Sequence, residues 1–262
     1  MSVTVRLAGI GLLGPGLADW AGGEALLRDP AGWQRATTVV PPPARLPPTE
    51  RRRAGPMVKC ALVVADQAVA ASGLDAATLP TVFTSSTGEP SNCHALCEAL
   101  AAPERMVSPT RFTNSVHNAA AGYWHIAAHA MAPSTSLGAF DASFGAGLVE
   151  AAVQCATGRH PVLLVACDVP YPEPLHAKRP LADSFGVAFV LAPAGAGPVL
   201  RLALQGEAAA TPCVHAGFDD LRRTIPAARA LPLLEALARR RAGPVVVEGL
   251  AGQSVMVELD LA

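Results

Sequence analysis

The stretch GAFDASFGAGLVEAA, residues 138–152, has the pattern of a turn that presents a reactive side chain. A strand-like run, STSLGAF, enters it, small residues form the turn, and a helix-forming run follows. Such a turn places a nucleophile at a helix N-terminus, where backbone N–H groups stabilise a developing anion. The stretch contains no cysteine. It therefore has the scaffold of a reactive site without a thiol.

Three side chains near this turn have types suited to hydrolysis, with Ser143 as nucleophile, His117 as base and Asp141 as acid. A serine hydroxyl needs a base to become nucleophilic, and a catalytic triad is recognised by geometry. The sequence also lacks the G-x-S-x-G pattern of α/β-hydrolases. A serine hydrolase stays as an alternative, and Asp141 is either a helix N-cap or a site residue.

The six cysteines do not have the spacing of a metal or redox motif. The sequence lacks C-x-x-C, and Cys93, His94 and Cys97 lack the second ligand pair that zinc requires. Most of the cysteines lie in apolar patterns, which is typical of reduced, structural residues in a cytoplasmic protein. We expect no metal, no cofactor and a structural role for all six: Cys60, Cys93, Cys97, Cys155, Cys167 and Cys213.

Composition excludes two further classes of protein. The formal net charge of −1 over 262 residues argues against a general nucleic-acid-binding protein. Apolar runs of about 18 residues, which a membrane span requires, are missing from the sequence. The first residues alternate like a strand and lack a signal-peptide cleavage pattern. We therefore expect a cytoplasmic protein with a large core, since 51% of the residues are hydrophobic.

Strand patterns alternate with helix patterns along the chain, which predicts an α/β protein with a partly parallel sheet. Apolar residues at helical spacing predict a helix over 57–72 that ends at Gly73, and Asp19 is a suitable N-cap for a helix over 19–29. Residues 39–48 and 108–118 are predicted loops, and 50–56 a basic surface segment. The other predicted helices cover 93–100, 118–131, the residues after Asp141, and 231–243, and the predicted strands cover 3–13, 80–87, 134–140, 160–168, 184–193, 198–204, 244–250 and 254–261.

The order of elements resembles the N-terminal part of a β-ketoacyl synthase over residues 3–193. The residues that carry the resemblance are Ser108-Pro109, Asn118, Ala121-Gly122, Pro133-Ser134, Gly158 and Asp168. The resemblance implies a thiolase-like α-β-α fold, truncated relative to a full synthase. It implies one ketoacyl-synthase-like domain over 1–262, with the synthase core at 1–193 and a reduced C-terminal part at 194–262.

The resemblance also implies that the synthase's catalytic groups are missing. An ungapped register places Asp141 on the position of the family's active cysteine, and a looser register with a three-residue insertion places Phe144 there. The family also carries two histidines in its C-terminal half. Beyond Asp168 this chain has only His176 and His215, and neither stands in a matching motif. We therefore expect no condensing activity from the chain alone.

Synthase-like subunits without the cysteine are called chain-length factors when they pair with an active synthase and shape its acyl tunnel. The length of this chain and its SFGAGLVEAA helix look most like the shorter group found in aryl polyene and xanthomonadin-type systems. The resemblance implies a heterodimer with an active β-ketoacyl synthase in polyketide or fatty-acid-like polyene biosynthesis, with an acyl carrier protein as an indirect partner. A malonyl-carrier-protein decarboxylase that uses the remnant pocket is the alternative.

In this family the strand before the nucleophile pairs with its counterpart across the dimer. The resemblance therefore implies that residues 134–140 and the loop before residue 119 form the partner interface and face the acyl tunnel. The charged runs at 50–53 and 238–241 are either solvated faces or a docking patch for the carrier protein. We expect Tyr123 and Trp124 to be packed, with the Trp N–H hydrogen-bonded. The implied interface and tunnel residues are Phe112, Thr113, Asn114, Ser115, His117, Asn118, Ala119, Ser134, Thr135, Ser136, Leu137, Phe140 and Phe144, the last of which is alternatively a core residue.

Overall fold

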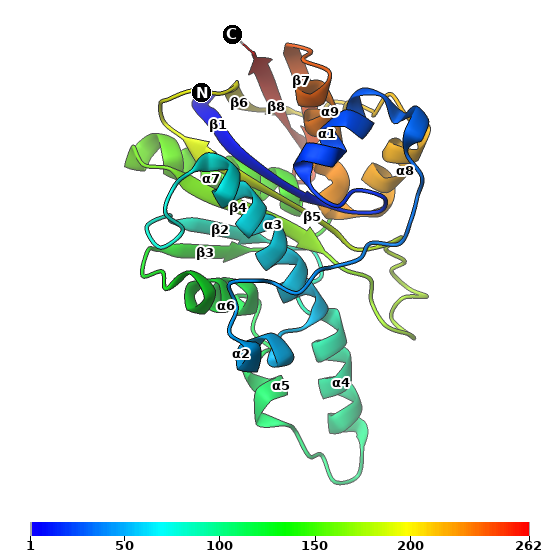
Figure 1. Cartoon of the computed structure of the whole chain (residues 1–262). Helices are drawn as coiled ribbons and strands as arrows, with labels where there is room; N and C mark the ends of the chain where they lie inside the picture. The colour runs from blue at the N-terminus through cyan, green and yellow to red at the C-terminus, as the bar shows by residue number, and fades with distance from the viewer. Residues whose placement is uncertain (1, 262) are drawn as a thin grey trace.

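A computed structural model describes residues 2–261 and contains one mixed eight-stranded sheet in the order β3-β2-β4-β5-β1-β6-β8-β7 (Figure 1). The strands β2 and β3 are parallel, as are β2 and β4, and the other neighbours are antiparallel. The prediction of a partly parallel sheet is confirmed. The strands are β1 (Ser2–Leu13), β2 (Thr81–Thr84), β3 (Ser134–Leu137), β4 (Val162–Asp168), β5 (Phe185–Ala192), β6 (Val199–Gly206), β7 (Gly243–Glu248) and β8 (Gln253–Asp260).

Helices cover both faces of the sheet, so that two hydrophobic clusters form on either side of it. Along β4, Leu164 and Ala166 face one cluster while Leu163 and Val165 face the other, as the two-residue period of a strand requires. The first cluster includes residues of α1 (Trp20–Arg28), α7 (Ser143–Gly158), α8 (Ala216–Thr224), the 3₁₀ helix η2 (Pro226–Ala230) and α9 (Leu231–Ala238), and the second includes α3 (Pro56–Ser72) and α6 (Ala119–Ala128).

The long helix α3 lies directly against the central strand β1. A Cβ at Gly11 would clash with the carbonyl oxygen of Val64, and one at Gly9 with that of Ala68. The two glycines therefore allow a closer approach than any other residue would. The helix ends where predicted, at Gly73, whose φ of 68° is the left-handed conformation that glycine adopts without strain.

A helical arm extends away from the sheet below α3 (Figure 1). It consists of α2 (Pro48–Arg53), α4 (Pro90–Ala101) and α5 (Pro109–Thr113). Within α4 only Pro90 and Asn92 are buried. The predicted loop over 108–118 is therefore partly wrong, because Pro109 starts a short helix in which Phe112 N donates to Ser108 O (2.9 Å).

Other boundaries differ from the predictions for local reasons. Helix α6 stops at Ala128, three residues early, because His129 adopts a left-handed φ of 52°. Strand β3 stops at Leu137 instead of continuing to residue 140. Helix α8, with two aspartates and two arginines in nine residues, escaped prediction, as did α2 and the 3₁₀ helix η1 (Pro30–Gly32).

Glu89 links the arm to the body of the protein. Its Oε2 accepts a hydrogen bond from Val58 N (3.4 Å) in the first turn of α3, and its Oε1 is buried with no hydrogen-bond partner among residues 2–261. The carboxyl lies against Gly55, where a Cβ would clash with it. Burial raises the pKa of Glu89 to about 7, although the backbone N–H groups of α3 partly oppose that rise.

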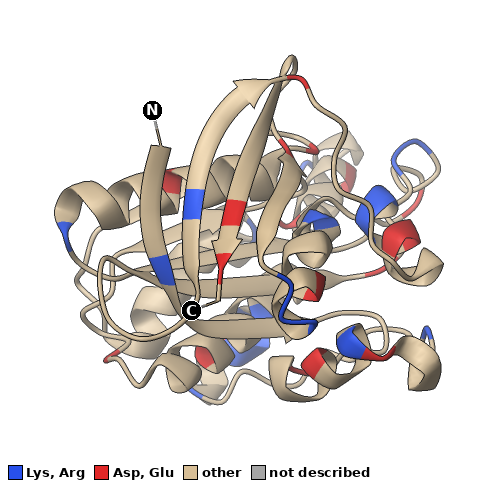
Figure 2. Cartoon of the chain, turned by 90° about the horizontal axis from the view of Figure 1, so that it is seen from above, with Lys and Arg blue, Asp and Glu red and all other residues tan. Residues whose placement is uncertain are grey.

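Residues 194–261 add strands β6, β7 and β8 to the same sheet and helices α8, η2 and α9 to the same face as α7. Figure 2 shows that positions with Lys or Arg and positions with Asp or Glu are interspersed along the chain. Within residues 2–261, no helix combines the length and apolarity needed to cross a membrane.

Candidate functional site

The turn between β3 and α7 is a tight elbow at the end of the parallel strands. Phe140, at its centre, has a φ of 52°, in the left-handed region that residues with a side chain rarely adopt. Backbone bonds from Ala142 N to Ala139 O (3.0 Å) and from Ser143 N to Phe140 O (3.3 Å) hold this shape. Strain of this kind, of order 1–3 kcal/mol, persists only where the surroundings enforce it, and it is typical of functional sites.

Ser143 stabilises this elbow through its side chain. It is 2% exposed, and its hydroxyl donates to Phe140 O (2.7 Å) while accepting from Ala139 N (2.9 Å). The ring of His117 lies near Gly138, and it makes no hydrogen bond to Ser143 in the described chain. The three side chains considered for a hydrolase therefore do not form a hydrogen-bonded triad.

Asp141 faces two arginines. Arg179, in the loop after β4, donates from Nη2 to Asp141 Oδ1 at 2.7 Å, and Arg229 Nη2, from η2, lies 3.6 Å from Oδ2. Arg179 also donates to Ser86 Oγ (3.2 Å), and its guanidinium carbon lies 3.9 Å from the centre of the Phe140 ring. Asp141 makes no capping hydrogen bond to α7 within residues 2–261, so of its two sequence interpretations the N-cap is wrong.

The buried carboxyl of Asp168 connects two segments that lie next to the elbow. Asp168, at the end of β4, is 1% exposed and accepts hydrogen bonds from Ser85 Oγ (3.1 Å), Ser86 N (2.7 Å) and Ala227 N (2.8 Å). Burial raises the pKa of Asp168 and these hydrogen bonds oppose the rise. The carboxyl thus joins the loop after β2 to η2, which carries Arg229.

Residues 27–220 match the family model described as β-ketoacyl synthase, N-terminal domain. The chain belongs to the β-ketoacyl synthase family. The match continues past residue 193, into the part that we treated as the reduced C-terminal part. No curated protein matches the chain.

Solved structures of this family share the fold along nearly the whole chain. A chain in the ketosynthase (ApeO) in complex with its chain length factor (ApeC) from Xenorhabdus doucetiae is 24% identical, with a TM-score of 0.75 over 97% of this chain and 99% of that one. For the ishigamide ketosynthase/chain length factor the identity is 16% and the TM-score 0.73, with 99% of both chains covered.

A third structure, AntDE:AntF, is a type II PKS acyl-carrier protein in complex with its ketosynthase bound to the hexaketide. It is 12% identical, with a TM-score of 0.72 over 100% of both chains. At these identities the likeness establishes the fold alone. The expected thiolase-like α/β fold of a synthase N-terminal domain is confirmed.

This synthase-family chain exposes four large apolar side chains, one on α5, one on α6, one before β3 and one in the elbow. Phe112 is 70% exposed, Ile126 46%, Met131 94% and Phe140 65%. Met131 and Phe140 flank β3 in sequence, and β3 is an edge strand that pairs only with β2 in the described sheet. Sequence reasoning missed Ile126 and Met131, because an apolar residue on a predicted helix is normally assigned to the core.

The residues implied as interface or tunnel residues fall into three groups. Thr113, Ser115, His117, Asn118 and Ser134 are exposed like Phe112 and Phe140, whereas Ala119, Thr135, Ser136 and Leu137 are partly buried. The other two are buried. Asn114 donates to Arg53 O (3.0 Å) and accepts from the Tyr123 hydroxyl (3.2 Å), so it fastens α5 to the body.

Phe144 lies in the hydrophobic core. It is 0% exposed, and its ring meets that of Phe189 edge-to-face at 6.1 Å between centroids. A side chain without any accessible surface cannot reach a partner subunit, so Phe144 is a core residue. Tyr123 and Trp124 are packed as expected, at 8% and 0% exposed. The expected hydrogen bond of the Trp124 N–H is wrong, because its Nε1 is buried without a hydrogen-bond partner among residues 2–261.

Four of the six cysteines are buried, and none forms a disulfide within residues 2–261. Burial raises the pKa of Cys155 to about 11 and also raises those of Cys167 and Cys213, so these thiols stay protonated. Cys93 and Cys97 are exposed on α4, and their structural role remains a prediction. The described residues contain no group of three side chains that could hold a metal ion.

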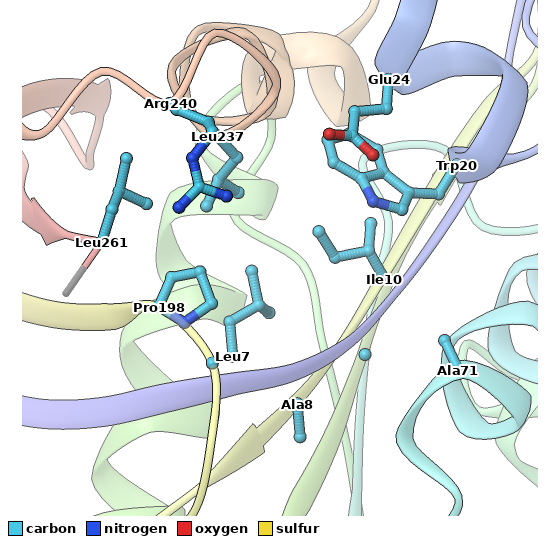
Figure 3. Close-up of a pocket in the computed structure, with 12 residues that line it drawn as sticks. Leu7, Ala8, Ile10, Trp20, Glu24, Ala71, Pro198, Leu237, Arg240 and Leu261 are labelled. Carbon is cyan, nitrogen blue, oxygen red and sulfur yellow. The ribbon is translucent and has the colours of Figure 1, made fainter.

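A cavity of about 410 Å³ lies between β1, α1 and α9, away from the elbow (Figure 3). Leu7, Ile10 and Leu237 form its apolar wall, and Trp20 and Arg240 stand at its sides. It shares no lining residue with the elbow.

Proposed function

We propose that this chain is a non-catalytic β-ketoacyl synthase-like subunit, a chain-length factor that pairs with an active β-ketoacyl synthase. The observation that carries the proposal is the elbow. At the place where the family resemblance puts the nucleophile, Asp141 is held in ion pairs with Arg179 and Arg229. A carboxylate has no sulfur atom with which to form the acyl thioester that a condensation requires.

The edge strand β3 and the exposed apolar side chains of Met131 and Phe140 before and after it support a permanent partner. An exposed edge strand such as β3 invites pairing with another chain, and proteins normally cover such edges. Obligate interfaces bury roughly 2,000 Å² or more. The similar structures that are complexes of a ketosynthase with its chain length factor supply a precedent for such a pair.

The exposed loop before α6 is the segment with which this subunit would shape the acyl tunnel. Thr113 and Ser115 hold α5 through side-chain bonds to Pro109 O (3.0 Å) and Phe112 O (2.7 Å). A loop stiffened in this way presents Phe112 and His117 at fixed positions. The product would be a polyketide or an aryl-polyene-like chain made in the cytoplasm, with the growing chain on an acyl carrier protein.

The test is co-expression with the ketosynthase encoded nearest to this gene. The two chains should co-purify one-to-one, and Ile126→Glu should abolish co-purification while Val39→Glu, at a position 80% exposed in the proline-rich segment, should not. Ser115→Trp should shorten the product without stopping condensation, because it adds bulk to the loop only. A stable monomer that leaves the synthase's products unchanged would contradict the proposal.

The decarboxylase alternative predicts a different result. Purified alone, the chain would release carbon dioxide from a malonyl-carrier thioester, and no β-ketoacyl product would form.

A further inference from the structure

A basic cavity of about 290 Å³ opens beside the elbow, between the loop after β4 and the segment that contains η2. Four cationic side chains and one carboxylate, that of Asp141, line it. The cations are Lys178, Arg179, Arg223 and Arg229.

The charges of this cavity do not balance. Arg223 is paired with Asp219, with Nε 3.3 Å from Oδ2, and Asp219 also pairs with Arg222, which pairs in turn with Glu248. Arg179 and Arg229 share the one carboxylate of Asp141, and Lys178 has no ion pair in the described chain. Because Glu248 balances Arg222, the four lining cations against the carboxylates of Asp141 and Asp219 leave two positive charges uncompensated.

The imbalance is notable because the two arginines are largely withdrawn from water. The side chain of Arg229 is 18% exposed and that of Arg179 is 22% exposed. Arg229 is 3.6 Å from Asp141, which is too long for a hydrogen bond, and the described residues offer its guanidinium no other partner. The Nε of Arg179 is buried and also lacks a hydrogen-bond partner within residues 2–261. Charges held partly out of water are normally paired, so the guanidinium of Arg229 at the wall of the cavity points to an external anion.

We propose that this cavity binds the dianion of a phosphomonoester. Two uncompensated charges match a dianion, and guanidinium groups match the oxygens of a phosphate in pairs. Lys178 adds a mobile point charge at the rim. Pro180 and Pro226 also line the cavity and offer apolar surface to the carbon group of the ester. The cavity adjoins the elbow, since Arg179 also lies over the ring of Phe140 at 3.9 Å from its centre, and titration of the chain without a partner tests this inference separately from the proposed pairing with a synthase.

Asp141 competes with the proposed ligand for the two arginines, so replacing Asp141 should raise the affinity, whereas replacing an arginine should lower it. Its carboxylate occupies the arginines when the cavity is empty, at 2.7 Å from Arg179. Asp141→Asn removes that competing charge and keeps the size of the side chain. It should therefore tighten phosphomonoester binding, by about threefold or more for the loss of one partly screened charge.

The experiment is isothermal titration calorimetry of the full chain with n-butyl phosphate at pH 8, with chloride balancing the ionic strength. We expect one saturable site. Arg229→Gln should weaken binding by about tenfold, the effect typical of one charge-assisted contact. The matched control is Arg52→Gln on the exposed surface of α2, which should leave the dissociation constant unchanged.

Two further measurements keep the proposal falsifiable. Because Arg229→Gln could disturb η2, the exposed Lys178→Gln serves as a second variant and should weaken binding by about threefold without altering the thermal midpoint. Malonate, a dicarboxylate of the same charge, should bind more weakly than the phosphate ester. Unchanged binding in both variants, weaker binding in Asp141→Asn, or a preference for malonate would each overturn the proposal, whether or not the chain pairs with a synthase.

Discussion

Replacing Phe144 by alanine distinguishes a core side chain from one that plugs an acyl tunnel. Phe144 has no exposed surface and meets Phe189 edge-to-face. Truncation of a fully buried phenylalanine to alanine costs about 3–5 kcal/mol, which includes the lost aromatic contact of about 0.5–1.5 kcal/mol. Since a domain is stable by only about 5–15 kcal/mol, this change removes a large part of the total.

The measurement is urea unfolding of the purified chain, followed by far-UV circular dichroism. With a slope of about 3 kcal/mol per molar urea, a loss of 4 kcal/mol lowers the midpoint by more than about 1 M. The matched control is Phe112→Ala, at a position 70% exposed, which should change stability by less than about 0.5 kcal/mol. If Phe144→Ala kept the wild-type midpoint and instead lengthened the product made with a synthase, our assignment of Phe144 to the core would be refuted.

Three other predictions concern the elbow, the arm and helix α6. Asp141→Cys should yield no β-ketoacyl product by mass spectrometry, because a thiol does not replace the two missing histidines; sustained turnover would contradict this. Glu89, with its pKa raised to about 7, stabilises the fold fully below about pH 4.5 and loses this contribution as the pH rises through 7. Glu89→Gln should therefore raise stability by about 2 kcal/mol at pH 8 and hardly at pH 4.5, whereas a pH-independent difference between variant and wild type would count against the raised pKa. A Cβ at Gly122 meets nothing within 4 Å, so Gly122→Ala should stabilise the chain alone by about 0.5–1 kcal/mol and raise its thermal midpoint. Gly122→Leu should prevent co-purification with the synthase. A lower thermal midpoint for Gly122→Ala would argue against this prediction.

The elements with strong periodicity were predictable from the sequence. Helix α3 carries apolar residues at helical spacing and a glycine at its end, and β4 is apolar up to its last residue, Asp168, so both were placed within a few residues. Helices α2, α5 and α8 were not, because short or polar helices depend on contacts with distant segments, which a local pattern does not contain.

The candidate site was predictable only where it rests on local sequence. The elbow and Asp141 follow from the small-residue turn between a strand pattern and a helix pattern. Arg179 and Arg229 lie 38 and 88 residues further along the chain, and they reach Asp141 only because the ends of β4 and η2 meet there. An arginine in a proline-rich loop carries no sequence signal for such a contact, so both arginines were missed.

The position of β1 in the sequence determines how long this strand stays unpaired while the chain is synthesised. The central strand β1 leaves the ribosome well before its partners, which are β5 at Phe185–Ala192 and β6 at Val199–Gly206. At about 5–20 residues per second, roughly 10–30 s pass before the first partner is synthesised. Throughout that interval a run of mostly apolar residues waits unpaired, and no N-terminal fragment can complete the sheet. Newly made chains should therefore depend on chaperones that bind this apolar segment until its partners are synthesised. The yield of folded protein should be higher when the chain is expressed at moderate temperature.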